Sequence, residues 1–336
     1  MTPERLRALV GDIFVRAGMV EDNARTVADV LVWAELRGLG SHGVMRVPRY
    51  VEWMRRGDLN GHPDIITRES GATITVDADR AAGPVAMVRA AELAVAKARD
   101  TGIALVLVRS TTHTGAIGYY TQLGARSGMA MIAITASVPN MAYHGARAAG
   151  VSTAPLSIAV PGEEEPLALD MGSGMISVGK LAQARRSGER LAAGSALDAS
   201  GEPTTDPRTA TLPLPLGGPK GSGLALLIEC LSSLLAGNPI LAEALEGTPK
   251  GKRHYQNALL IAIDVARFLP LPEFKKQVDR LVRNIKALPP QAGAEILVPG
   301  ERGHRQAQRT KDIKLQASVL EELGALARSL GVEVPA

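Results

Sequence analysis

The period of the apolar residues changes once, near residue 72, and this change restricts the possible folds more than any other feature of the sequence. Up to that point apolar residues recur every three or four positions, in stripes over residues 6–17 and 22–34, which is typical of amphipathic helices. Beyond it, segments 73–77 and 103–109 indicate strands, and the alanine-rich segment 84–100 indicates a helix. Helices followed by strand–helix–strand units predict an α+β protein with helices covering a mixed sheet.

The rest of the chain extends this pattern. We expect further strands at residues 129–135, 150–160, 166–171, 258–266 and 295–298, and further helices at 48–56, 119–127, 181–187, 224–235, 272–288 and 312–329. Residues 195–213 are rich in Gly, Pro, Asp and Thr without apolar periodicity, so a long ordered loop is expected there. We expect residues 1–70 with 300–336 to form a helical domain, and residues 71–299 a mixed α/β domain that binds cofactor and substrate, with a subdomain around 115–255.

Composition and charge exclude several classes of protein. Aromatic residues make up 3% of the chain, which argues against a surface that stacks on nucleic-acid bases. The 38 basic and 34 acidic residues are interspersed, so no dense basic face indicates a nucleic-acid partner, and the slight positive excess suits an anionic ligand. Cys230 is the only cysteine, which excludes an intrachain disulfide framework and a thiolate metal cluster, and its apolar neighbours predict a buried helix residue.

Targeting signals are not expected. The first residues carry charges where a signal peptide needs an apolar core, and no segment approaches the roughly 20 apolar residues of a membrane span. We therefore expect a cytoplasmic protein without a membrane partner.

The segment 38–50 combines residue types that suit acid–base chemistry on a carboxylate. Ser41 and His42 lie between Gly40 and Gly43, and Arg46 follows one turn later. Histidine can give or take a proton near neutral pH, and the planar guanidinium of arginine matches a carboxylate. A turn between two helices, with a surface histidine and an arginine that caps the core, explains the same residues equally well.

The histidine spacing disfavours a metal site. The six histidines at 42, 62, 113, 144, 254 and 304 form no His-x-His or His-x-x-x-His pair. His42 and His113 differ from the others because small residues flank both, and His113 follows a buried strand, where ligand sites of α/β sheets gather. Each could equally cap a helix or form a turn.

Three glycine-rich turns are candidates for anion binding. Residues 172–179 miss the Rossmann fingerprint by two positions, and residues 217–223 lack the spacer and adjacent Lys-Ser of a P-loop. Exposed amides at a helix start beside Lys220 still suit an anion, as does the turn at 299–304, although tight turns without a ligand account for both. A Ser-His-Asp hydrolase using Ser41 or Ser110 is the rival interpretation. It is disfavoured because Ser41 and His42 are adjacent, so their side chains should point apart, and no Gly-x-Ser-x-Gly is present.

Taken together, these motifs resemble the malate/L-lactate dehydrogenase family, which has the sulfolactate-dehydrogenase-like, non-Rossmann fold. This family includes ureidoglycolate dehydrogenase, diketogulonate reductase and cyclic ketimine reductases. The resemblance spans most of the chain and rests on the segments 40–50, 110–120, 169–171, 196–207, 214–224 and 299–302.

The resemblance implies an NADH- or NADPH-dependent homodimer, with the active site near the interface, that reversibly reduces 2-oxo acids or cyclic imino acids. It implies that His42 is the proton donor oriented by Ser41, that Arg46 holds the substrate carboxylate, and that His113 is a further catalytic residue lining the nicotinamide and substrate pocket. Ser137 would line both cofactor and substrate, and Thr153 would contact the substrate. The implied cofactor residues are His113, Ser137, Asp170, Met171, Gly172, Ser173, Gly174, Lys220, Pro299, Gly300, Glu301 and Arg302, and no metal is implied.

Two departures from the family pattern bear on the substrate. The segment Ser152-Thr153-Ala154-Pro155 stands where members usually have Gly-Thr-Asn-Pro, and Ala136 replaces an asparagine. Lys180 matches members that act on hydroxy acids, whereas ketimine reductases tend to carry aspartate there. The resemblance therefore favours a small 2-oxo acid as substrate, with a cyclic imino acid as the alternative and a non-catalytic anion-binding protein on the same fold as a third interpretation.

Overall fold

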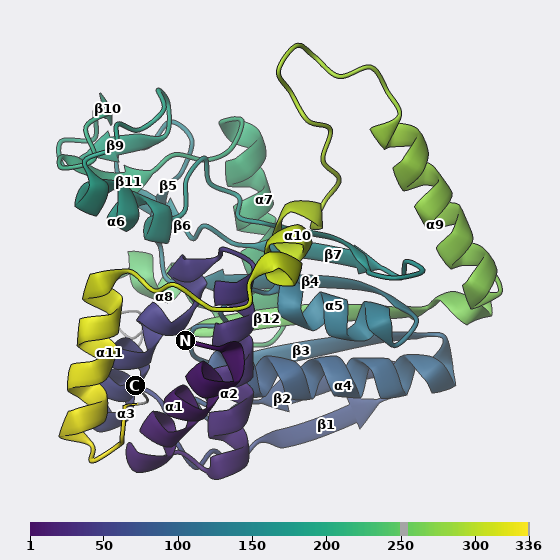
Figure 1. Ribbon diagram of the computed structural model, residues 1–336, viewed down its shortest axis with the longest axis horizontal. Helices are drawn as coiled ribbons and strands as arrows, with labels where there is room; N and C mark the ends of the chain where they lie inside the picture. Colours follow the sequence, from purple (N-terminus) through teal and green to yellow (C-terminus); the bar gives the residue numbers. More distant parts are fainter. Residues whose placement is uncertain (249–254, 335–336) are drawn as a thin grey trace.

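The computed structural model describes residues 1–248 and 255–334 and confirms the α+β architecture, in which helices surround a mixed sheet (Figure 1). Its N-terminal region contains α1 (Pro3–Arg16), α2 (Glu21–Leu36), the 3-10 turns η1 (Gly40–His42) and η2 (Val44–Arg46), and α3 (Val47–Arg56). The hydroxyl of Thr2 caps α1 by accepting a hydrogen bond from the amide of Arg5 at 3.3 Å. Gly57 ends α3 in the left-handed conformation at φ +73°.

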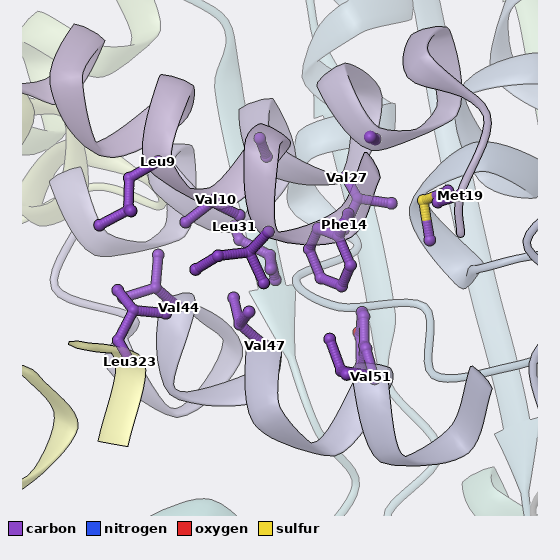
Figure 2. Packing of buried hydrophobic residues seen from close by; sticks show 14 of the residues in the cluster. Leu9, Val10, Phe14, Met19, Val27, Leu31, Val44, Val47, Val51 and Leu323 are labelled. Atoms are coloured by element: carbon purple, nitrogen blue, oxygen red, sulfur yellow. The ribbon is translucent and has the colours of Figure 1, made fainter. Parts of the chain in front are cut away.

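One hydrophobic core joins the two ends of the chain (Figure 2). The apolar stripes of α1 and α2 meet there, with Leu31 fully buried between them. Leu323 of α11 (Ala317–Ser329) reaches the same core from the C-terminal end. The contact supports a helical unit built from both ends of the chain, while the domain limits at residues 70 and 300 stay a prediction.

The main sheet has seven strands in the order β1-β2-β3-β12-β4-β7-β8. They are β1 (Ile66–Ser70), β2 (Thr73–Asp77), β3 (Ile103–Thr111), β12 (Gln256–Asp264), β4 (Met129–Ser137), β7 (Leu156–Val160) and β8 (Leu167–Met171). Only β2 and β3 pair in parallel, and all other neighbours are antiparallel. The sheet is therefore mixed, and its last strand in sequence lies at its centre.

The two faces of the sheet are covered by different helices. Val106 and Leu260 face the core under α4 (Gly83–Thr101) and α5 (Gly118–Arg126). Their neighbours on the strands, such as Leu107 and Leu259, point to the opposite face, as the two-residue period requires. On that face they pack against α7 (Pro219–Glu229) and the π-helical turn η3 (Cys230–Leu234).

A small layer stands beyond the carboxyl ends of β4 and β8. It contains β5 (Met141–Ala142), β6 (Ala149–Val151), α6 (Val178–Ser187), β9 (Ala196–Asp198), β10 (Pro203–Thr204), β11 (Ala210–Pro213) and α8 (Leu241–Leu245). Residues 195–213 thus form a three-stranded sheet, and the expectation of a long loop was wrong. Strands of two to four residues are too short to produce a readable alternation.

Other expectations need correction. The single strand expected at 150–160 is divided into β6 and β7, β1 was not anticipated, and residues 295–298 are not a strand. Cys230 is half-buried and not fully buried. His254 lies outside the described residues.

Helix α9 (Leu271–Lys286) lies at one side of the molecule, and a long connection leads from it to α10 (Glu301–Arg309) (Figure 1). Helix α9 contacts the β7–β8 turn through Asp279, which accepts from the amide of Glu163 at 3.4 Å, and α10 through the ion pair of Lys286 with Glu301. Its expected amphipathic pattern is confirmed as a helix, yet none of its residues is buried within this chain. Leu281 and Ile285 remain 58% and 41% exposed. The described part of this chain therefore covers the apolar stripe only in part, since Val278 and Val282 are half-buried while Leu281 and Ile285 are exposed.

Within residues 1–248 and 255–334, no helix is both long and apolar enough to span a bilayer.

The core that joins the chain ends gives a direct stability test. Leu323 is 1% exposed and Leu320, on the same helix, is 45% exposed. We expect Leu323→Ala to lower the free energy of unfolding by about 2–4 kcal/mol, because it leaves a cavity between both ends of the chain. The control Leu320→Ala should cost less than about 0.5 kcal/mol. Urea denaturation measures both, and equal losses would contradict a shared core.

Candidate active site

The two 3-10 turns between α2 and α3 carry the predicted proton donor and carboxylate site. Ser41 Oγ lies 3.0 Å from His42 Nδ1, so the two side chains touch. The expectation that they point apart was wrong. Adjacent side chains diverge inside regular helices, whereas His42 is the last residue of a three-residue turn and is not held to that geometry.

His42 is held neutral by its surroundings. Burial, and next the positive charge of Arg46, lower the pKa of His42 to about 4. No carboxylate is hydrogen-bonded to this ring in the described part of the chain, so the arrangement lacks the third member of a Ser-His-Asp triad.

His113 follows β3 by two residues and is fixed by contacts to its Nδ1 atom. The hydroxyl of Tyr50 lies 2.7 Å from Nδ1, and the amide of Gly115 donates to the same atom at 3.3 Å. The amide N–H of Gly115 can only donate, so Nδ1 is the acceptor in that contact. Tyr50 is fully buried, and burial raises its pKa, so it remains an uncharged hydroxyl.

The structure brings the two predicted histidines together from positions far apart in the sequence. The ring centroids of His42 and His113 are 5.7 Å apart, with an angle of 21° between the ring planes. Tyr50 links both elements, because it belongs to α3 and also donates to the carbonyl of His113 at 3.1 Å. The result is one imidazole pair at the junction of the helical region and the sheet.

Arg46 lies beside this pair with its guanidinium turned back on the loop. Its Nε donates to the carbonyl of Ser41 at 2.7 Å. Burial lowers its pKa, but an arginine stays charged in proteins. Among the described residues no hydrogen bond engages its two terminal nitrogens, so this fork remains available for a carboxylate.

The pairing of the sheet strands brings two other predicted residues, His113 and Ser137, to the same end of the sheet. Gln256 of β12 pairs with Thr111 on one side and with Ser137 on the other, so three strand ends lie side by side. The side chain of Gln256 accepts from both the amide and the hydroxyl of Thr114 at 2.8 Å. His113, two residues beyond β3, and Ser137, at the end of β4, therefore lie on the two sides of β12 at the same edge of the sheet.

The segment Ser152-Thr153-Ala154-Pro155, which departs from the family pattern, lies next to Ser137. Ser152 Oγ accepts from the amides of Ser137 at 3.4 Å and Ala154 at 3.3 Å. Thr153 is held by Asn140, whose side-chain oxygen accepts from the Thr153 amide at 2.8 Å. The serine that stands in place of glycine thus organises the backbone around both predicted substrate residues.

Asp170 lies near the end of β8 and anchors the start of α5. Its Oδ2 accepts from the amide of Gly118 at 2.8 Å. The residue is exposed to solvent, yet the protein atoms around its carboxylate desolvate it and raise its pKa to about 6. A carboxylate with a raised pKa beside a helix start is typical of functional clefts.

The turn after Met171 fits an extended phosphate-bearing ligand. A Cβ on Gly172 would lie 3.2 Å from the carbonyl of Thr153, so only glycine fits there without a shift. Ser173 Oγ is buried and has no hydrogen-bond partner among the described residues. The turn thus has a closely packed backbone and an unpaired buried hydroxyl, and the cofactor role expected for it stays a prediction.

Lys220 approaches the same turn from α7. The amide of Leu216 donates to the carbonyl of Ser173 at 2.8 Å, and Gly174 forms an isolated bridge with Pro215. These contacts hold the first turn of α7 against residues 173–174, with Lys220 exposed at its N-terminus.

The segment Pro299, Gly300, Glu301 and Arg302 lies at the other end of β8. Pro299 accepts from the amide of Ala168 at 3.4 Å, and a Cβ on Gly300 would lie 2.8 Å from the carbonyl of Ala168. This segment borders a cleft of about 290 Å³. It is separated from Asp170–Gly174 by only about 10 Å along the strand. The structure thus brings these residues near the other cofactor residues without joining them to the His42–His113 pair.

Sequence reasoning missed Tyr50, Glu35, Gln256 and Asn140. Tyr50 and Glu35 flank the motif around His42, but only the fold reveals which side chains turn toward it. Gln256 and Asn140 carried no local signal, since their roles come from strand pairing and loop contact.

The expectation of no metal site is untested. No group of three or more His, Cys, Asp or Glu able to hold a metal occurs within the described ranges. His304 lies elsewhere, with Nδ1 3.7 Å from a carboxylate oxygen of Glu165.

Solved structures define the class of this fold. The chain superposes on malate dehydrogenase from Entamoeba histolytica with a TM-score of 0.94 at 27% identity, covering 100% of this chain and 99% of the other. It superposes on sulfolactate dehydrogenase from Methanocaldococcus jannaschii with a TM-score of 0.90 at 36% identity, covering 99% and 98%. Both are dehydrogenases, and the alignments extend over the whole fold.

The family model for malate/L-lactate dehydrogenase matches residues 1–324, and the chain belongs to this family of oxidoreductases. It is 37% identical over 339 residues to L-sulfolactate dehydrogenase of Methanocaldococcus jannaschii, covering 99% of this chain and 98% of the relative. It is 34% identical to ureidoglycolate dehydrogenase (NAD(+)) of Escherichia coli strain K12, covering 89% and 86%. It is also 31% identical to the Delta(1)-pyrroline-2-carboxylate/Delta(1)-piperideine-2-carboxylate reductase of Pseudomonas putida, covering 97% and 95%.

The environment of His42 gives a titration test. We expect its ring to titrate near pH 4 in the free protein, well below the ordinary value of about 6.5. Since the unfolded chain takes up this proton first, stability contributed by His42 should fall as pH drops from about 6.5 toward 4. Arg46→Met should raise the pKa of His42, whereas Arg49→Met should leave it unchanged. NMR of the His42 ring, assigned with His42→Ala, measures each value, and an unshifted pKa would contradict the burial argument.

Proposed function

We propose that this protein reversibly reduces a small 2-oxo acid to the 2-hydroxy acid with NADH or NADPH. The observation that carries the proposal is the His42–His113 pair, 5.7 Å between centroids, beside the available fork of Arg46. A 2-oxo acid needs both features, because hydride delivery to its carbonyl creates an oxyanion and its carboxylate needs a fixed cation. Three of the relatives named above are dehydrogenases named for 2-hydroxy acids, namely sulfolactate, ureidoglycolate and malate.

The cofactor, when bound, supplies the hydride. We assign its binding to Asp170–Gly174, Ser137, His113 and Lys220, with Pro299–Arg302 at the far end of β8. Ser173 would use its unpaired hydroxyl, and the exposed Lys220 at the start of α7 would offset phosphate charge. Neither NADH nor NADPH is favoured by these contacts.

The low pKa of His42 affects the oxidation and the reduction directions differently. A neutral ring is ready to take the proton of a 2-hydroxy acid in the oxidation direction. In the reduction direction it needs a proton first. A carboxylate bound to Arg46 would offset the positive charge that lowers the pKa of His42, so substrate binding itself favours the protonated ring.

Ser41 and Arg46 support the same chemistry. Ser41 Oγ would hold the Nδ1 side of His42, and the Arg46 guanidinium would place the substrate carboxylate next to that ring. Thr153, fixed by Asn140, would contact the substrate from the opposite side.

Reduction of a cyclic imino acid is the alternative. Its C=N bond also lies next to a carboxylate, so Arg46 and His42 would serve it equally. Lys180 argues for the 2-oxo acid, because the ketimine-reducing members of the family tend to carry aspartate there. Position 180 lies close to the proposed site, because a Cβ added to the preceding Gly179 would lie 2.5 Å from the Cβ of Ser41.

We also propose a cytoplasmic homodimer whose active site lies near the interface. Exposed leucines line α7 and η3, with Leu227 at 61% and Leu234 at 50%, and α9 carries a second apolar stripe that is only partly covered. Apolar surfaces of this extent favour a partner chain.

A substrate panel tests the proposed reaction. We expect absorbance loss from NADH or NADPH with small 2-oxo acids, and slower loss with cyclic imino acids. The variant His42→Ala should have a kcat lower by about 10²-fold or more, because the proton donor is lost. If the protein bound anions but reduced no compound of the panel, the interpretation as a non-catalytic anion-binding protein would be supported instead.

Arg46 provides a second test. We expect Arg46→Ala to raise KM for carboxylated substrates steeply, and Arg46→Lys to restore only part of the affinity because it keeps the charge and loses the planar fork. Steady-state kinetics with one substrate at saturating cofactor measures both. An unchanged KM in Arg46→Ala would place the carboxylate elsewhere.

A further inference from the structure

Glu35 lies beneath the loop that carries His42. It is the penultimate residue of α2, next to the fully buried Ala34, so the hydrophobic core fixes its backbone. The chain leaves the helix at Arg37 and folds back over the Glu35 side chain. The amide of Leu39 is tied to the carbonyl of Ala34 at 2.8 Å, which begins this return.

The carboxylate of Glu35 binds the junction of the two 3-10 turns. Its Oε1 accepts from the amide of Val44 at 2.9 Å. Its Oε2 faces Gly40, where an added Cβ would lie 3.6 Å away. The carboxylate thus spans the concave side of the turn, from the residue before Ser41 to the residue two after His42.

Gly43 leaves the space that Glu35 occupies. A Cβ on Gly43 would lie 2.5 Å from Cδ and 2.8 Å from Cγ of Glu35, and closer still to Oε1. Its φ of −94° is open to any residue, so the need for glycine here comes from this contact and not from the backbone angle. Glu35 and Gly43 therefore form one matched pair.

Such support matters because 3-10 turns are weak. Each turn here has three residues, and hydrogen bonds in 3-10 geometry are poorer than in an α-helix. The junction at Gly43 sets the direction of His42 before it and of Arg46 after it. Burial raises the pKa of Glu35, so placing this carboxylate under the loop carries a cost that the Val44 hydrogen bond partly offsets.

We propose that Glu35 is a positioning residue: its carboxylate, seated in the space left by Gly43 and bonded to the Val44 amide, aims His42 and Arg46 at the substrate. The inference rests on the proposed function for its catalytic consequence. Glu35 itself contacts neither His42 nor Arg46 through a hydrogen bond in the described part of the chain.

A double-mutant cycle tests the pair. We expect Glu35→Ala to lower kcat by about 10- to 100-fold, as misplacement of catalytic groups by about 1 Å does. Glu35→Gln keeps the acceptor and the shape, and should remain within about threefold of the wild type. Gly43→Ala should displace the Glu35 side chain and cause a similar loss. Because both changes remove one interaction, the double variant Glu35→Ala/Gly43→Ala should be no worse than either single variant.

Controls separate positioning from general damage. Glu21→Ala, an exposed glutamate on the same helix, should leave kcat unchanged. The dissociation constant for NADH, measured by fluorescence, should be unchanged in every variant, since the cofactor residues lie on other elements. If Glu35→Ala fails to fold, Glu35→Gln and Gly43→Ala still test the pair.

One readout does not depend on activity. In the wild type and in Glu35→Gln the Val44 amide should be protected from hydrogen exchange, and Glu35→Ala or Gly43→Ala should speed its exchange about tenfold or more. The proposal would be overturned if the two losses of kcat multiplied in the double variant, or if Glu35→Gln lost as much kcat as Glu35→Ala. It would also be overturned if hydrogen exchange of the Val44 amide were the same in all variants. If the wild type reduces no compound of the panel, the proposed function fails, while exchange still decides whether Glu35 holds the loop.

Discussion

The site depends on the register of β12 between β3 and β4. This strand comes late in the sequence, yet its first residue pairs with the ends of both neighbours. Gln256 accepts two hydrogen bonds from Thr114, and Asn257 accepts one from the amide of Ser110 at 3.0 Å. Ser110 has a φ of +58°, an angle that costs energy in a residue with a side chain. Adjacent residues of β12 thus hold both sides of the turn that carries His113 toward His42.

Local signals predicted much of the fold and part of the site. The change of period near residue 72 was enough for the α+β class, because helices and strands bury faces with different repeats. Ser41, His42 and Arg46 could be singled out because glycine, histidine and arginine stand together in one turn. Their contacts could not: Ser41 touches His42 only because the 3-10 turn ends there, and Tyr50 reaches His113 only through the tertiary fold.

Helix α9 illustrates a second limit of prediction from the sequence, which concerns what covers an apolar surface. Its periodicity predicted a helix with an apolar stripe, and the helix is present, but periodicity says nothing of what covers that stripe. Helix η3 is a similar case, since the continuous apolar run around Cys230 indicated burial, while Leu231 and Leu234 remain about half exposed at 48% and 50%. Apolar content predicts that a surface will be covered, but not whether the cover comes from the same chain.

The charges around His42 connect binding with proton transfer. Burial lowers the pKa of His42 and Arg46 lowers it further, so in the free protein the permanent charge of this loop is that of the guanidinium. An anionic substrate is attracted to that charge, and once paired it removes part of the penalty on protonating the ring. By linkage, a proton on His42 then costs less when the carboxylate is bound, and the carboxylate binds more tightly when His42 is protonated. A 2-hydroxy acid entering for oxidation meets the opposite demand, because there the neutral ring must take a proton. The same charge of Arg46 beside His42 therefore favours substrate-dependent proton uptake in one direction and opposes it in the other.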